Sequence, residues 1–145
     1  MIEPESIVDY ATAKSDAEGD YLYRLWRATN IHTVHGHMAS GHLQGRLLKM
    51  LVMMQRPRAI LEVGTFSGYS AICMAEGLKE VAEEAGHNGN DDTPRLYTFE
   101  INDEMEDFTR KWIDGSDVAS FIDFRIGDAV KEAPKLGVKF DLVFI

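Results

Sequence analysis

The fold of this chain is decided by the stretch Ala59-Ile-Leu-Glu-Val-Gly-Thr-Phe-Ser-Gly-Tyr-Ser-Ala71. Its first five residues form a short apolar run with one acid, Glu62, which predicts a buried strand. Gly64 and Gly68 bracket the next three residues, and glycine permits sharp turns and the close approach of another group. Apolar residues then recur at helical spacing, so a helix follows. A strand, a glycine loop and a helix together form the usual cradle for a nucleotide-like ligand in α/β sheets.

The rest of the chain extends this unit into a sheet. The pattern predicts strands over 59–63, 95–100, 121–126 and 139–145, and helices over 4–14, 20–29, 41–55, 68–84, 102–113 and 128–136. Residues 30–40 break the helical pattern. From residue 59 strands and helices alternate, and right-handed crossovers then give a parallel sheet with helices on both faces. We therefore expect an α/β fold, with an N-terminal helical region over 1–57 that serves as a cap or dimer face, and a Rossmann-like core over 58–145.

Composition limits the classes of function. The chain has 145 residues, 24 acidic against 15 basic side chains, and a net charge of -9. This balance argues against general nucleic-acid binding, which needs a basic surface. Apolar runs stay shorter than the roughly 18 residues of a membrane span, and the acidic start does not resemble a secretory signal. With Cys73 as the single cysteine, these features predict a cytoplasmic protein that binds a small molecule, without nucleic-acid or membrane partners.

The end of the sequence is unusual. It consists of the apolar strand pattern Phe140-Asp-Leu-Val-Phe-Ile145. A strand this apolar is typical of a sheet centre, buried on both faces. Because no helix follows to cover it, we expect a partial core that is truncated at its C-terminus.

An acid at the end of the second strand is the next candidate for a binding role. Glu100 stands where such sheets place a carboxylate that accepts hydrogen bonds from ribose hydroxyls. The spacing from the glycines exceeds the usual value of about 20 residues, and the loop over 86–94 accounts for the excess. The alternative is a solvated acid at a strand end.

The glycine loop also indicates which nucleotide is bound. It lacks the third glycine of the dinucleotide fingerprint and the lysine of the phosphate-binding loop. Glu62 stands two residues before the first glycine, where it would repel a pyrophosphate and attract a cation such as the amino group of S-adenosylmethionine. The loop therefore favours a cationic nucleoside cofactor over NAD or ATP.

Several segments, taken together, resemble a known family. They are Met38-Ala-Ser-Gly-His-Leu-Gln-Gly45, Glu62-Val-Gly-Thr-Phe-Ser-Gly-Tyr-Ser70, Thr98-Phe-Glu-Ile-Asn-Asp103, Ile126-Gly-Asp-Ala129 and Phe140-Asp-Leu-Val-Phe-Ile145. With these segments, which span about residues 30–145, the chain resembles the class I S-adenosylmethionine-dependent O-methyltransferases of the cation-dependent catechol and caffeoyl-CoA type.

The resemblance implies a role for each matching residue, all of them in binding the cofactor. Glu100 would hold the ribose hydroxyls, and Ile101, Asp128 and Ala129 would lie at the adenine. The methionine end and the sulfonium would be lined by Met38, Ser40, Glu62, Gly64, Phe66, Gly68 and Ser70.

The resemblance also implies the chemistry of the complete enzyme. Relatives of this type bind Mg²⁺ through an Asp directly after the strand matching 140–145 and through an Asp-Asn pair beyond, and the metal holds a catechol-like diol. No catalytic and no metal residue is expected within this chain. The complete enzyme would methylate a phenolic hydroxyl, whereas the fragment alone would have little or no activity.

Other interpretations stay open at this point. The alternative function is a non-catalytic nucleotide-binding or protein-interaction module, and an NAD-dependent reductase is disfavoured by the missing glycine. The histidines at 32, 35, 37 and 42 do not place three metal ligands on one helical face, so we interpret them as loop and surface residues. Cys73 is expected to be a buried and unreactive thiol.

Overall fold

The computed structural model describes residues 4–86 and 93–145, so part of the expected surface loop over 86–94 lies outside the described residues. The strands are β1 (Ala59–Val63), β2 (Arg95–Glu100), β3 (Ile122–Ile126) and β4 (Leu142–Phe144). The α-helices are α1 (Pro4–Lys14), α2 (Gly19–His32), α3 (Gly41–Gln55), α4 (Tyr69–Glu84), α5 (Glu106–Asp114) and α6 (Ala129–Glu132). Short 3-10 turns cover Gly36–Met38, Asp103–Met105, Ala119–Phe121 and Ala133–Leu136.

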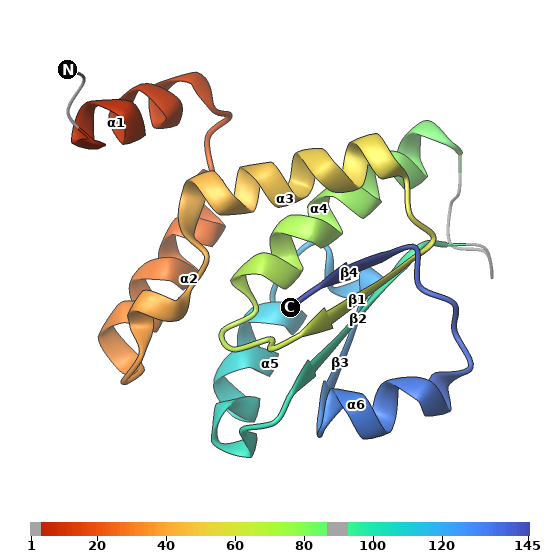
Figure 1. The fold of residues 1–145 in the computed structure, drawn as a ribbon. Helices are drawn as coiled ribbons and strands as arrows, with labels where there is room; N and C mark the ends of the chain where they lie inside the picture. Colours follow the sequence, from red (N-terminus) through yellow and green to blue (C-terminus); the bar gives the residue numbers. More distant parts are fainter. Residues whose placement is uncertain (1–3, 87–92) are drawn as a thin grey trace.

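The strands form one parallel sheet in the order β3-β2-β1-β4. Along the chain, β2 and β3 are added one after the other on one side of β1, and β4 is then added on the other side of β1. This reversal moves the crossover helix to the opposite face, so α3 and α4 cover one face of the sheet and α6 the other (Figure 1). The expected Rossmann-like α/β fold is confirmed. In such sheets ligands bind at the carboxyl ends of the strands next to the reversal, here the ends of β1 and β4.

Two glycines let α3 approach α4 closely. A Cβ atom on Gly45 would lie 2.6 Å from Sγ of Cys73, and one on Gly77 would lie 3.0 Å from the carbonyl oxygen of Lys49. The first distance is shorter than real Cβ contacts and the second is at their tight limit, so a larger residue at either position would force the neighbouring atoms to shift. Cys73 is fully buried in this contact, which confirms its expected burial, and burial raises its pKa to about 12, so the protonated thiol is favoured.

The second helix is longer than the sequence pattern predicts. It runs to His32 rather than ending near residue 29. Side chains bond back to carbonyl groups one turn earlier, with Asn30 Nδ2 donating to Trp26 O at 2.8 Å and Thr33 Oγ1 to Thr29 O at 2.7 Å. Asn30 therefore continues the helix, although asparagine more often ends one.

The last strand is shorter than the sequence pattern predicts. It covers only Leu142–Phe144 and pairs with β1 alone among the described strands, so it is an edge strand in which Val143 is 55% exposed. Burial of this strand on both faces stays a prediction for a complete sheet, because among the described strands it pairs on one side only. Just before it, Asp141 accepts hydrogen bonds from the backbone N–H groups of Arg58 (2.8 Å) and Ala59 (3.1 Å), which lower the pKa of Asp141 and join β4 to the start of β1.

Within the described residues, every helix is too short or too polar to cross a membrane.

Candidate functional site

The loop between β1 and α4 turns sharply at the carboxyl end of the sheet. Gly64, Phe66 and Gly68 have φ angles of 95°, 49° and 86°, in the left-handed region that favours glycine. The N–H groups of Gly64 and Thr65 donate to the carbonyl oxygen of Phe99 at 2.9 and 3.2 Å, which fixes the loop against the end of β2. Thr109 of α5 donates a hydrogen bond to the carbonyl group of Phe66. The loop is therefore held from two sides and presents a preformed surface.

Two cavities meet along this loop. The smaller, of about 240 Å³, lies over the start of α4, and the larger, of about 770 Å³, lies over the end of β2. Both are lined by Met38, Val63, Gly64 and Phe66. The shared lining makes them two compartments of one elongated site, which suits a ligand with two different ends.

Glu100 forms the floor of the larger compartment. It is 8% exposed, and its carboxylate accepts hydrogen bonds from the backbone N–H groups of Phe66 (2.7 Å) and Asn102 (2.9 Å). Each carboxylate oxygen keeps a further lone pair for a ligand hydroxyl. The interpretation of Glu100 as a solvated acid is therefore wrong, because the side chain is held in place and ties the glycine loop to the segment after β2.

Glu62 lies behind the loop instead of facing a compartment. It is fully buried, and its carboxylate accepts hydrogen bonds from the hydroxyl groups of Ser70 and of Thr98, the latter at 2.6 Å. Thr65 adds a third hydroxyl, 2.6 Å from that of Thr98. The pKa of Glu62 is raised to about 7, mainly by burial; the hydrogen bonds from Ser70 and Thr98 oppose the rise, and the nearby charge of Glu100 adds to it.

This raised pKa predicts a pH-dependent stability. The folded protein keeps the proton on Glu62 up to about pH 7, whereas the unfolded chain releases it near 4.5. The folded state binds more protons between these values, so its stability falls as the pH rises from about 4.5 to 7 and is then constant. Relative to Glu62→Gln, the wild-type free energy of unfolding should decrease by about 3 kcal/mol between pH 4.5 and 8. Urea titrations of both proteins measure this difference, and parallel pH profiles would contradict the prediction.

The structure brings together about half of the residues that the sequence nominates. Six of them line the compartments, namely Met38, Ser40, Gly64, Phe66, Ser70 and Glu100. Gly68 supports the loop from behind, since a Cβ atom there would lie 3.1 Å from Cγ1 of Ile113 on α5. Glu62 also lies behind the loop.

The three remaining nominated residues lie outside the lining of both compartments, as the described residues define it. Ile101 is 74% exposed beside Glu100. Asp128 caps α6 by accepting a hydrogen bond from the N–H group of Val130 at 3.0 Å, and Ala129 is buried against Phe99. The N–H group of Gly127 donates to the carbonyl group of Glu100 at 2.7 Å, so this segment adjoins the end of β2.

Sequence reasoning missed other residues of the lining. They include Gln44, Thr65, Ser67, Phe144 and Ile145 in the smaller compartment, and His32, His35, Asn102, Glu104 and Phe108 in the larger one. Asn102 and Phe144 could have been found, because carboxyl ends of parallel strands meet at one edge of the sheet. The hydroxyl oxygen of Ser67 is buried without a hydrogen-bond partner among the described residues.

Comparison with known proteins shows what the chain is similar to. A family model described as O-methyltransferase matches residues 12–145. Catechol O-methyltransferase of Niastella koreensis is 33% identical over 106 residues, which are 70% of this chain and 42% of that protein. The mouse (Mus musculus) catechol O-methyltransferase is 29% identical over 105 residues, 72% of this chain and 35% of that protein. The chain thus spans less than half the length of these two relatives.

Solved structures give the same picture of the fold. The O-methyltransferase TomG of Streptomyces achromogenes, in complex with SAM, superposes with a TM-score of 0.77 at 27% identity, over 99% of this chain and 61% of that one. The SAH-bound methyltransferase PaMTH1 of Podospora anserina superposes with a TM-score of 0.81 at 24% identity, over 96% of this chain and 55% of that one.

Proposed function

Because this chain belongs to the O-methyltransferase family, we propose that it binds S-adenosylmethionine and serves the transfer of a methyl group to a phenolic or catechol-type hydroxyl. The observation that carries the proposal is the two-compartment site around Gly64, with Glu100 fixed in its floor. The names of the relatives support the acceptor class, since several are catechol O-methyltransferases and one is a caffeoyl-CoA O-methyltransferase.

The residues present fit such a cofactor. A Cβ atom on Gly64 would meet no atom of the described residues within 4 Å, so the loop leaves open space where the two compartments join. We assign the amino-acid end to the smaller compartment, beside Ser40 and Ser70, and the ribose to Glu100. When bound there, the cofactor supplies an electrophilic methyl group on a sulfonium.

The residues nominated for adenine are part of the same proposal. Ile101 offers an exposed apolar side chain next to Glu100, where an aromatic base could pack on it. Asp128 and Ala129 begin α6 beside the end of β2 and would border the other edge of the base. Glu62 acts from behind the loop, where its carboxylate fixes the hydroxyl group of Ser70.

A divalent cation is proposed only for the complete enzyme. Among the described residues, no group of three or more His, Cys, Asp or Glu side chains could hold a metal ion. Under this proposal, as the resemblance to cation-dependent enzymes implies, the ligands of Mg²⁺ belong to other residues of the complete enzyme. We expect little or no methyl transfer from these 145 residues alone.

Calorimetric titration tests the cofactor assignment directly. S-adenosylhomocysteine should bind with one site per chain, and NADH, added as a control dinucleotide, should give no heat of binding. Absence of binding by S-adenosylhomocysteine, or equal binding of NADH, would overturn the proposal. Binding without methyl transfer to catechol in the presence of Mg²⁺ is the result expected for this chain.

A further inference from the structure

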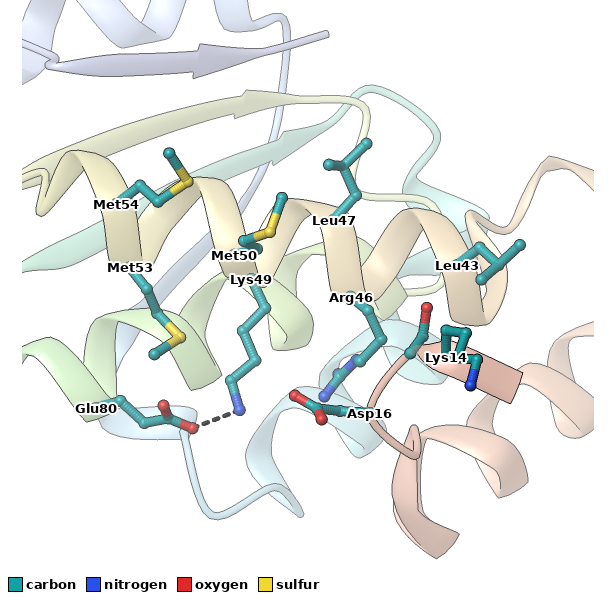
Figure 2. A pocket seen from close by; sticks show the side chains of 11 residues that line it. Lys14, Asp16, Leu43, Arg46, Leu47, Lys49, Met50, Met53, Met54 and Glu80 are labelled. Carbon is teal, nitrogen blue, oxygen red and sulfur yellow. Dashed lines mark ion pairs between the residues drawn. The ribbon is translucent and has the colours of Figure 1, made fainter. Parts of the chain in front are cut away.

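Two buried side-chain atoms have no hydrogen-bond partner among the described residues, Nε of Arg46 and Oγ of Ser67. Arg46 is compensated in another way, because its guanidinium pairs with Glu76 at 2.8 Å. It lies at a groove of about 650 Å³ on the outer face of α3, where Lys49 likewise reaches Glu80 (Figure 2). For the hydroxyl group of Ser67 the described residues offer no such compensation, and an unpaired buried donor costs free energy.

Ser67 stands at the start of α4, in the lining of the smaller compartment. It is 1% exposed and directly precedes Gly68, the N-cap of this 16-residue helix. Because glycine has no side chain, Gly68 cannot accept hydrogen bonds from the N–H groups of the first turn, and the positive end of the helix dipole attracts an anion. Among the described residues, no charged side chain lines this compartment.

The three other buried hydroxyl groups of this lining are paired within the protein. Their partners are Thr98 for Thr65, Glu18 for Tyr69 and Glu62 for Ser70. A hydroxyl group has one proton, so Tyr69 and Ser70, which donate theirs to carboxylates, cannot also donate to a ligand. Within the part of the chain that the structure describes, Ser67 is therefore the buried hydroxyl group of this lining whose proton is free for a ligand.

We infer that Ser67 donates a hydrogen bond to the carboxylate of the cofactor's amino-acid end and thereby selects ligands that carry this group. The inference rests on the proposed function and specifies how the smaller compartment binds that end. A carboxylate accepts hydrogen bonds and carries the charge that a helix start attracts, whereas the ammonium group carries the charge that it repels. A serine hydroxyl turns about one side-chain torsion, so it can follow the acceptor without movement of the loop.

This role predicts opposite effects of Ser67 on the free protein and on the complex. Ser67→Ala removes a buried donor that has no partner among the described residues, so the free variant should unfold at the wild-type temperature or above it. The same change removes a donor from the complex and weakens it. A hydroxyl group with a purely structural role would behave differently, because its removal would lower stability and leave binding unchanged.

Calorimetry with two ligands tests the inference. Ser67→Ala should bind S-adenosylhomocysteine at least about tenfold more weakly than the wild type does, which corresponds to the loss of one hydrogen bond to a charged group. It should bind decarboxylated S-adenosylhomocysteine, which lacks the acceptor, as tightly as the wild type does. Thermal unfolding of the free proteins gives the second measurement.

Ser116→Ala is the matched control. Ser116 lies outside the lining of both compartments, as the described residues define it, and its hydroxyl group donates to the carbonyl group of Ile113 at 2.7 Å. This variant should be less stable than the wild type and should bind both ligands normally.

Three results for Ser67→Ala would overturn the inference alone. They are wild-type affinity for S-adenosylhomocysteine, an equal loss of affinity for both ligands, and a clearly lower unfolding temperature of the free variant. Failure of the wild type to bind S-adenosylhomocysteine would instead overturn the proposed function, and this inference with it.

Discussion

Gly64→Ala should abolish the binding of S-adenosylhomocysteine while the protein stays folded. Gly64 lines both compartments, and its φ of 95° directs a Cβ atom into a space where no atom of the described residues lies within 4 Å. The added methyl group would therefore occupy the junction that the cofactor has to cross. Calorimetry should show a loss of affinity of at least about 100-fold, which corresponds to roughly 3 kcal/mol.

A matched glycine separates this effect from backbone strain. Gly137 also has a positive φ, 63°, and a Cβ atom on it would likewise meet none of the described residues within 4 Å. A left-handed alanine costs about 1–2 kcal/mol at either site, so both variants should unfold a few degrees below the wild type. Gly137→Ala should bind S-adenosylhomocysteine normally. Wild-type affinity in Gly64→Ala would show that the cofactor does not cross this junction.

The fold could be predicted from the sequence because local pattern and tertiary packing agree over most of the chain. The strand at 59–63 and the helix at 41–55 have the predicted bounds, since each carries its own periodicity and a clear stop. The end of α2 was missed because the bond from Asn30 to Trp26 reinforces the helix that asparagine usually ends. The length of β4 was missed, since it covers Leu142–Phe144 instead of 139–145, because apolar composition does not tell where pairing with β1 begins.

Part of the site could also be predicted, namely the residues whose position is fixed by local strand and loop geometry. Residues adjoining a glycine turn, such as Gly64 and Ser70, reach the cavity because strand and loop geometry places them there. The direction of the Glu62 side chain depends on Thr98, a partner 36 residues away, so the sequence could not show that the acid faces inward. His32 and His35 enter the lining through the packing of the N-terminal helices, for which the sequence has no local signal.

Removing the carboxylate of Glu100 should have an effect comparable with that of Gly64→Ala. In Glu100→Ala, the N–H groups of Phe66 and Asn102 lose their acceptor, and the cofactor ribose loses the group proposed to hold it. Glu100→Gln should also be impaired, because an amide has one acceptor oxygen and its NH₂ group would face a donor. We expect S-adenosylhomocysteine to bind at least about 100-fold more weakly to Glu100→Ala, with a smaller loss in Glu100→Gln.

A second ligand shows whether Glu100 touches the ribose or only positions the loop. The 2′-deoxy analogue of S-adenosylhomocysteine lacks one of the hydroxyl groups, so the wild type should bind it at least about tenfold more weakly than the parent compound, or 1.4 kcal/mol. Glu100→Ala should bind both compounds alike, because the partner of that hydroxyl is gone. Glu104→Ala removes the same charge from the same compartment and should keep the wild-type preference. If Glu100→Ala still discriminates between the two compounds, the carboxylate acts through Phe66 and Asn102, and the ribose is held by another residue.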